Sequence, residues 1–307
     1  MPGLLSDALA WVVILTFAVG VLSEDRNQRL ARYATVAAWV GFAVFWLQLV
    51  PHFAFVHKSY VEGVLAVAAV PASLYTGYLL WNGRDSLYVL SRAVAVMGLI
   101  YLPFETIPAF SLLGVAVPAP RGVLMENVAA QTGFLVNALG YHPEMIVGEQ
   151  GYLNTFLFFD GSHRLTVAVV LACTGLGSIA IFAGLIAAVK APLRRKLRAM
   201  AIAVPIIYAL NLLRTTFITI AFGKQYMQWF VDEIMFLFGS SDPYMVSFFI
   251  SDRIISQILA VVVLVGITYL VVRELPELLT VIEDVLFMLT GDEYDLESEL
   301  GLERSGA

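Results

Sequence analysis

The amino-acid sequence predicts an all-α integral membrane protein with about seven transmembrane helices. Of the 307 residues, 60% are hydrophobic and only 14% are charged, whereas soluble domains carry about 25% charged residues. The hydrophobic residues gather in long runs, and a helix needs roughly 20 such residues to cross a bilayer. Lysine and arginine concentrate in alternate loops between the runs. The same composition argues against nucleic-acid binding.

Seven runs are long enough to form these helices. The first has no basic segment before it and no small-residue cleavage site after it, so we expect a retained helix rather than a signal peptide. The fourth contains two prolines and a glutamate in its second half, and its helix is expected to end near Leu102. The last follows Asp242 and Pro243, an N-cap and a proline at the first helical position. The predicted spans are residues 4–22, 33–50, 60–81, 87–113, 164–189, 197–222 and 246–272.

Basic loops predict the orientation of the spans. The loop at 190–198 holds five lysines and arginines, the loop at 23–32 holds three arginines, and Arg84 lies in the loop at 82–86. Short loops rich in lysine and arginine stay in the cytoplasm. We therefore expect the N-terminus outside the cell and the C-terminus in the cytoplasm.

The sequence outside the spans predicts two further features. Segments 121–140 and 226–238 each carry apolar residues beside charged or amide residues, and we expect interfacial helices on the outer side, or lids over the outer helix ends. Residues 276–307 are acidic and are interpreted as a cytoplasmic tail, a short helix that fades into disorder. Residues 1–275 then form a single multi-pass transmembrane domain, with its catalytic half at about 160–272.

Three reactive or charged side chains fall at a similar predicted depth. Arg214 lies about eight residues from the outer end of its span, and Arg253 about seven residues from the outer start of the next, which places both roughly 10–12 Å below the outer interface. Cys173, the single cysteine, lies roughly 13 Å deep by the same rise. Charged side chains inside a membrane span are costly and by default indicate function. An arginine at this depth can also simply snorkel to the headgroups, and a lone thiol is usually a packing residue.

The residues around these three support a shared site. Asn211 and Arg214 are i, i+3 neighbours on one side of a helix. Ser256 and Gln257 share a face with Arg253. Thr174 follows Cys173, and Gly177 belongs to a stripe of small residues that also permits close helix packing. We therefore expect supporting roles for Asn211, Thr174, Gly177, Ser256 and Gln257.

A cysteine beside two arginines suits acyl transfer through a thioester. A nearby guanidinium favours the thiolate, and arginines stabilise the oxyanion of a tetrahedral intermediate or bind a carboxylate or phosphate. Arginine stays protonated and cannot act as the base. His163 and His142, in external segments, are the candidate bases, unless the substrate amine takes the proton itself. No metal site and no cofactor is expected.

The ordered residues Ala172-Cys173-Thr174-Gly175, Asn211-x-x-Arg214 and Arg253 resemble the exosortase/archaeosortase family, in its archaeal branch. The resemblance covers roughly residues 165–260. It implies a cysteine transpeptidase whose nucleophile is Cys173 and whose essential partners are Arg214 and Arg253. The implied substrates are secreted surface glycoproteins with a C-terminal sorting signal: a Pro-Gly-Phe motif, a transmembrane helix and a basic cluster. The implied acceptor of the new C-terminus is a membrane phospholipid, with the active site facing the extracellular side. Many bacterial relatives carry histidine where Arg253 stands.

Two other functions stay open at this stage. An intramembrane cysteine protease would use the same cysteine but pass the acyl group to water. A seven-span anion transporter or receptor would use the arginines for binding and would not need the thiol. The sequence argues against a retinal protein, which needs a lysine within its last span, because the four lysines (Lys58, Lys190, Lys196 and Lys224) lie in predicted loops.

Overall fold

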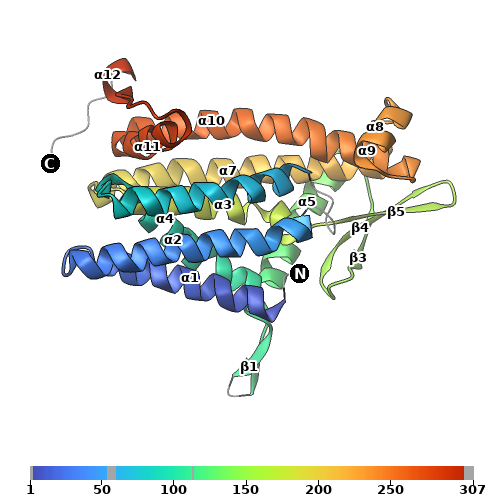
Figure 1. Ribbon diagram of the computed structural model, residues 1–307. Helices are drawn as coiled ribbons and strands as arrows, with labels where there is room; N and C mark the ends of the chain where they lie inside the picture. The colour runs from blue at the N-terminus through green and yellow to red at the C-terminus, as the bar shows by residue number, and fades with distance from the viewer. Residues whose placement is uncertain (1–2, 54–59, 113, 301–307) are drawn as a thin grey trace. The chain divides into compact units, whose positions relative to one another are not determined.

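The computed structural model describes residues 3–53, 60–112 and 114–300. Within these residues, six helical segments are long and apolar enough to cross a membrane, which confirms the prediction of a multi-pass, mainly helical membrane protein. Figure 1 labels these helices. They are α1 (Leu4–Ser23), α2 (Gln28–Pro51), α3 (Tyr60–Trp81), α4 (Tyr88–Thr106), α7 (Leu193–Gly223) and the stretch Pro243–Glu274 that contains α9 (Val246–Phe248) and α10 (Ser256–Glu274).

The predicted fifth span, 164–189, is wrong over its first half. Its helix α6 covers only Leu176–Ala188, 13 residues, and at 1.5 Å per residue this reaches about 20 Å. The preceding residues form strand β5 (His163–Ala168) and a 3₁₀ turn (Leu171–Thr174). Leu165 and Val167 are buried while Arg164 and Thr166 are exposed, the alternation of a half-buried strand. A hydropathy sum over the run does not register this period of two.

The fourth span also ends earlier than the apolar run suggests. Helix α4 continues past Leu102 to Thr106, whose hydroxyl donates to the Leu102 carbonyl at 2.8 Å and accepts from the Trp11 indole at 3.0 Å. The next residues form a hairpin of β1 (Phe110–Leu112) and β2 (Val115–Val117). The predicted end at Leu102 is therefore one turn early, and the predicted limit at 113 is too late.

The two segments predicted to form helices outside the spans are helical to different extents. Helix α5 (Pro120–Ala138) agrees with the prediction for 121–140. Helix α8 covers only Val231–Phe238, because the chain before it turns at Gln225 and Phe230, both of which have a positive φ. Between α5 and α6, strands β3 (Glu144–Val147), β4 (Leu153–Asp160) and β5 form an antiparallel sheet that hydropathy did not predict.

The acidic C-terminal segment is more structured than a short helix. It contains a 3₁₀ turn (Pro276–Leu278), α11 (Leu279–Thr290) and α12 (Leu296–Leu300). Arg84 anchors it, because its guanidinium lies 2.8 Å from both Asp284 and Glu293, and the ring of Phe287 stacks 3.8 Å below the same group.

Contacts divide the chain into two compact units. Unit 1 comprises Met1–Thr106, Ala180–Ala201 and Leu270–Ala307, and unit 2 comprises Ile107–Ile179 and Ile202–Tyr269. In unit 1, α1, α2 and α4 pack around Phe17, Trp39 and Leu87. In unit 2, α5, the sheet and the C-terminal end of α7 pack around Phe156, and Gly223 allows the Phe158 ring to lie directly against the α7 backbone. All the residues of the candidate site lie in unit 2.

Candidate active site

Cys173 sits on a tight turn between β5 and α6 rather than inside a helix. The turn is closed by the Cys173 amide, which donates to the Val170 carbonyl at 2.8 Å. The Thr174 hydroxyl donates to the Leu171 carbonyl at 2.6 Å and accepts from the Leu176 amide at 3.4 Å, where α6 begins. The Thr174 side chain therefore shapes the turn that carries the cysteine.

Gly175 completes this turn with a φ of +77°, a left-handed conformation that costs most other residues roughly 1–2 kcal/mol. An added Cβ there would also lie 3.2 Å from the Cβ of Asn211. The glycine therefore lets the chain reverse direction while α7 approaches closely.

Helix α7 holds the backbone of Cys173 through two side chains. Asn211 donates from Nδ2 to the Cys173 carbonyl at 2.5 Å, and Thr215 donates from its hydroxyl to the same oxygen at 3.2 Å. These residues are one helical turn apart and thus face the same side of α7. Arg214 lies between them in the sequence. Asn211 therefore holds the turn that carries the thiol against α7.

Both arginines share one carboxylate, that of Asp252. Arg214 Nη2 lies 2.7 Å from Asp252 Oδ1, and Arg253 Nε lies 3.4 Å from Asp252 Oδ2. Asp252 is only 9% exposed, and a buried carboxylate is stable only when it is paired. Asp252 thus joins α7 to the helix that follows α9 and brings two like-charged groups close together.

The residues around Asp252 form a π-helix, Phe249–Ile255, between α9 and α10. A π-helix hydrogen-bonds five residues back and is rare outside short segments, which are frequent at functional sites. Asp252 and Arg253 lie in this widened turn, where adjacent side chains reach each other. Sequence reasoning assumed regular α-helical geometry, in which neighbours point about 100° apart, and so gave Asp252 no part in the site.

The thiol lies within electrostatic range of Arg214, Asp252 and Arg253. It is only partly exposed and packs against the apolar cluster of Phe156, Val169 and their neighbours. Arg214 Nε is buried and has no hydrogen-bond acceptor among the described residues. One guanidinium donor near the thiol therefore remains available for an oxygen atom of a substrate.

Three more predicted supporting residues lie on α6 and α10. Ser256 is buried and Gln257 is half-buried in the first turn of α10. Gly177 has no atom within 4 Å of an added Cβ. The close helix approach expected of the small-residue stripe occurs instead at Gly184, where an added Cβ would lie 2.5 Å from the Ala93 carbonyl of α4.

Neither candidate base reaches the cysteine. His163 stacks face to face on Tyr244, with ring centres 3.8 Å apart, at the far end of β5. Val169 is six residues further along the chain, which corresponds to roughly 20 Å at the usual rise of a strand. His142 is exposed in the turn before β3. Neither makes a hydrogen bond to Cys173. No group of three metal-binding side chains occurs within the described part of the chain.

Fold and site together define a polytopic membrane protein with a cysteine, two arginines and a shared carboxylate in one unit. The profile of the family described as transmembrane exosortase matches residues 5–245, and the chain belongs to this family. That match includes Cys173 and Arg214 and ends before Arg253.

Two relatives are similar over nearly the whole chain. Archaeosortase A of Haloferax volcanii is 76% identical over 303 residues, which cover 99% of this chain and 100% of the relative. Archaeosortase A of Natronomonas pharaonis is 46% identical over 289 residues, which cover 92% and 88%. No solved structure matches the chain. Family and relatives identify a membrane enzyme of the sortase-like class.

Proposed function

We propose that this protein is a cysteine transpeptidase of secreted surface glycoproteins. In this proposal it recognises a C-terminal sorting signal, made of a Pro-Gly-Phe motif, a transmembrane helix and a basic cluster. It cleaves the signal through a Cys173 thioester and transfers the new C-terminus to a membrane lipid. The observation that carries the proposal is the turn-borne thiol beside two arginines that share the Asp252 carboxylate.

The first half-reaction forms the thioester. The Cys173 thiolate attacks the carbonyl carbon of the scissile peptide, and the new carbon–sulfur bond leaves a negative charge on the oxygen. Preorganised donors stabilise such an oxyanion, and the buried Nε–H of Arg214 is an available donor of this kind. The carbon–nitrogen bond then breaks, and the leaving amine takes the proton that the thiol gave up. This route needs no histidine, in agreement with the positions of His142 and His163.

The second half-reaction releases the enzyme. A nucleophilic oxygen of a membrane lipid attacks the thioester carbon, a carbon–oxygen bond replaces the carbon–sulfur bond, and the lipid proton returns to sulfur. Water in place of the lipid would give hydrolysis by the same intermediate. The basic loops favour a site that faces the extracellular side, where a secreted substrate presents its signal.

Asp252 acts in this proposal as a positioning residue. It touches neither the thiol nor the scissile bond, but it bonds Arg214 at 2.7 Å and lies 3.4 Å from Arg253. Without a shared anion the two guanidiniums would repel each other. The carboxylate thus keeps both positive groups near the sulfur while it balances one of their charges.

Replacing Cys173 tests the proposal directly. Cys173→Ala and Cys173→Ser should each abolish cleavage of a surface protein that carries the sorting signal, because the thioester can no longer form. Ser178→Ala is the matched control: this exposed serine lies five residues further on, and its replacement should leave cleavage intact. Full cleavage by both Cys173 variants would end the covalent-cysteine proposal.

Mass spectrometry of the product C-terminus distinguishes transfer from hydrolysis. A lipid adduct on the new carboxyl end is the expected result. A free carboxylate as the only product would identify a protease instead. Unchanged activity in both Cys173 variants, combined with loss of anion binding in Arg214→Gln, would identify the transporter alternative.

A further inference from the structure

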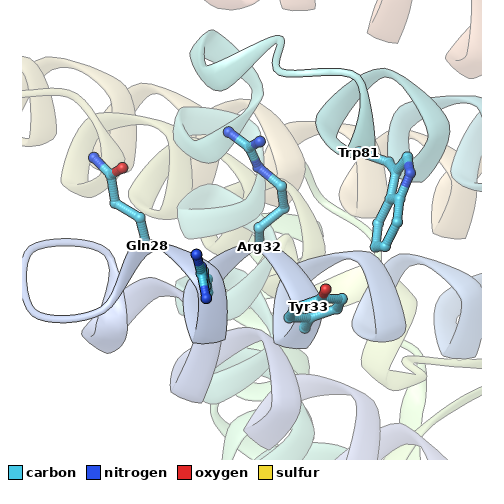
Figure 2. A pocket seen from close by; sticks show the side chains of 5 residues that line it. Gln28, Arg32, Tyr33 and Trp81 are labelled. Carbon is cyan, nitrogen blue, oxygen red and sulfur yellow. The ribbon is translucent and has the colours of Figure 1, made fainter.

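A cavity of about 470 Å³ opens in unit 1, where α2 begins and α3 ends. Figure 2 shows Gln28, Arg32 and Tyr33 of α2 and Trp81 of α3 around it. Arg29 is the fifth lining residue. None of these residues belongs to the candidate active site. The cavity lies at the ends of the helices that the basic loops place on the cytoplasmic side, whereas Cys173 is predicted on the outer side.

The cavity has an excess of positive charge. Arg32 Nη2 pairs with Asp85 Oδ1 at 2.9 Å, but its Nε is buried and has no hydrogen-bond acceptor within the described residues. Arg29 is exposed and forms no ion pair with any residue that the structure describes. The five lining residues thus include two arginines and no carboxylate, and the Asp85 carboxylate that pairs with Arg32 is more than half exposed. Guanidinium groups bind phosphate through paired hydrogen bonds.

Two aromatic rings form one side of the cavity. Tyr33 and Trp81 meet edge to face with ring centres 5.5 Å apart, although 61% of Tyr33 and 52% of Trp81 remains exposed. Tyrosine and tryptophan at the ends of transmembrane helices lie at the level of the lipid headgroups. Their positions therefore place the cavity, and the two arginines beside it, at headgroup depth.

An exposed apolar stripe continues from the cavity along α2. It begins at Tyr33 and repeats every three or four residues, the spacing of one helix face. At 1.5 Å per residue it extends for about 21 Å, comparable to the length of a lipid hydrocarbon chain. Arg29 lies one turn before Tyr33 on the same face. The stripe consists of Tyr33, Ala37, Val40, Val44 and Leu47, all of them exposed.

We propose that this cavity binds the phosphate headgroup of an anionic membrane lipid, whose hydrocarbon chains lie along the α2 stripe. The guanidinium groups of Arg29 and Arg32, which both line the cavity, contact the phosphate, and the Tyr33–Trp81 pair packs beside the glycerol region. An arginine that merely snorkels to the interface needs neither a lined cavity nor a ring pair. None of the residues that line the cavity takes part in the proposed transferase reaction.

Native mass spectrometry of the full-length protein in detergent tests this site. The protein is titrated with phosphatidylglycerol and, separately, with phosphatidylcholine of the same chains. Wild type should bind phosphatidylglycerol more tightly. Arg29→Gln should weaken this binding about fivefold, which corresponds to about 1 kcal/mol, and Arg29→Lys should restore most of it. The matched control is Arg26→Gln, because Arg26 is an exposed arginine just before α2 that does not line the cavity. This substitution should change binding less than twofold.

The same binding experiment distinguishes the anionic-lipid site from its alternatives. Equal losses in Arg26→Gln and Arg29→Gln would show diffuse surface attraction and overturn the proposal. Equal binding of the two lipids would exclude a headgroup-specific site. Inorganic phosphate that competes at the same concentration as the lipid would identify a free-phosphate site instead. Trp81→Leu tests the ring pair, because it retains both arginines and should still weaken phosphatidylglycerol binding.

Discussion

Asp252→Asn removes the negative charge that Arg214 and Arg253 share and preserves the shape of the side chain. The carboxylate oxygens lie 2.7 Å from Arg214 Nη2 and 3.4 Å from Arg253 Nε. At an effective dielectric constant of about 20, unit charges about 4 Å apart interact with about 4 kcal/mol. The arginine side chains are 29% and 25% exposed, and solvent screening lowers this value. We therefore assign about 3 kcal/mol to the shared charge.

This energy predicts a large change in turnover. Each loss of about 1.4 kcal/mol of transition-state stabilisation slows a reaction tenfold, so the cleavage rate of Asp252→Asn should fall about 100-fold. The assay follows cleavage of a surface-protein reporter in liposomes, at saturating reporter and at equal amounts of monodisperse enzyme. Saturation makes the rate report turnover rather than substrate binding.

Ser251→Ala is the matched control for this experiment. Ser251 is its buried neighbour in the same π-helix, and its hydroxyl donates to the backbone carbonyls of Ser247 and Phe248, at 2.7 and 3.3 Å. Its replacement removes no charge, and the cleavage rate should stay within about threefold of wild type. If Asp252→Asn keeps more than about a third of the wild-type rate, or if Ser251→Ala slows the enzyme equally, Asp252 does not position the arginines.

Two further substitutions test the packing that supports the site and the helix bundle. Gly175→Ala should lower the free energy of unfolding by roughly 1–2 kcal/mol, because Gly175 has a φ of +77°. The control is Gly177→Ala, whose added Cβ meets no atom within 4 Å. This control should match wild type in fluorescence-detected thermal unfolding. Equal midpoints for the two variants would contradict the predicted strain. Arg195→Gln breaks hydrogen bonds of 2.7 and 3.0 Å to the Glu277 carboxylate and should destabilise the protein by about 2 kcal/mol, while Arg194→Gln, at an exposed position, should have no measurable effect. A stable Arg195→Gln variant would show that this ion pair contributes little.

Residue types and hydropathy were sufficient to predict most of the membrane spans and the reactive residues of the candidate site. Five of the predicted spans correspond to helices whose ends differ from the prediction by a few residues. The helix of the fourth predicted span ends several residues before that apolar run ends. The Asp242 side chain caps its helix by accepting from the Tyr244 amide at 3.0 Å, as the Asp-Pro pair predicts. Hydropathy is a local property that adds along the chain, so it reveals helices that bury themselves in lipid. Cys173, Arg214 and Arg253 were also evident, because a thiol and charged groups are conspicuous in apolar sequence.

The detailed geometry of the site depends on partners that are distant in sequence. The strand before Cys173 exists because β4 pairs with it. The run 164–189 was predicted as a helix because only its summed hydropathy was considered. The sequence does not reveal that the Asp252 carboxylate pairs with both Arg214 and Arg253. Its closest partner, Arg214, is 38 residues away. The sequence by itself therefore determined the membrane spans and which reactive groups exist. Only the tertiary structure decided that one buried carboxylate joins both arginines beside the thiol, because that contact depends on how two helices pack.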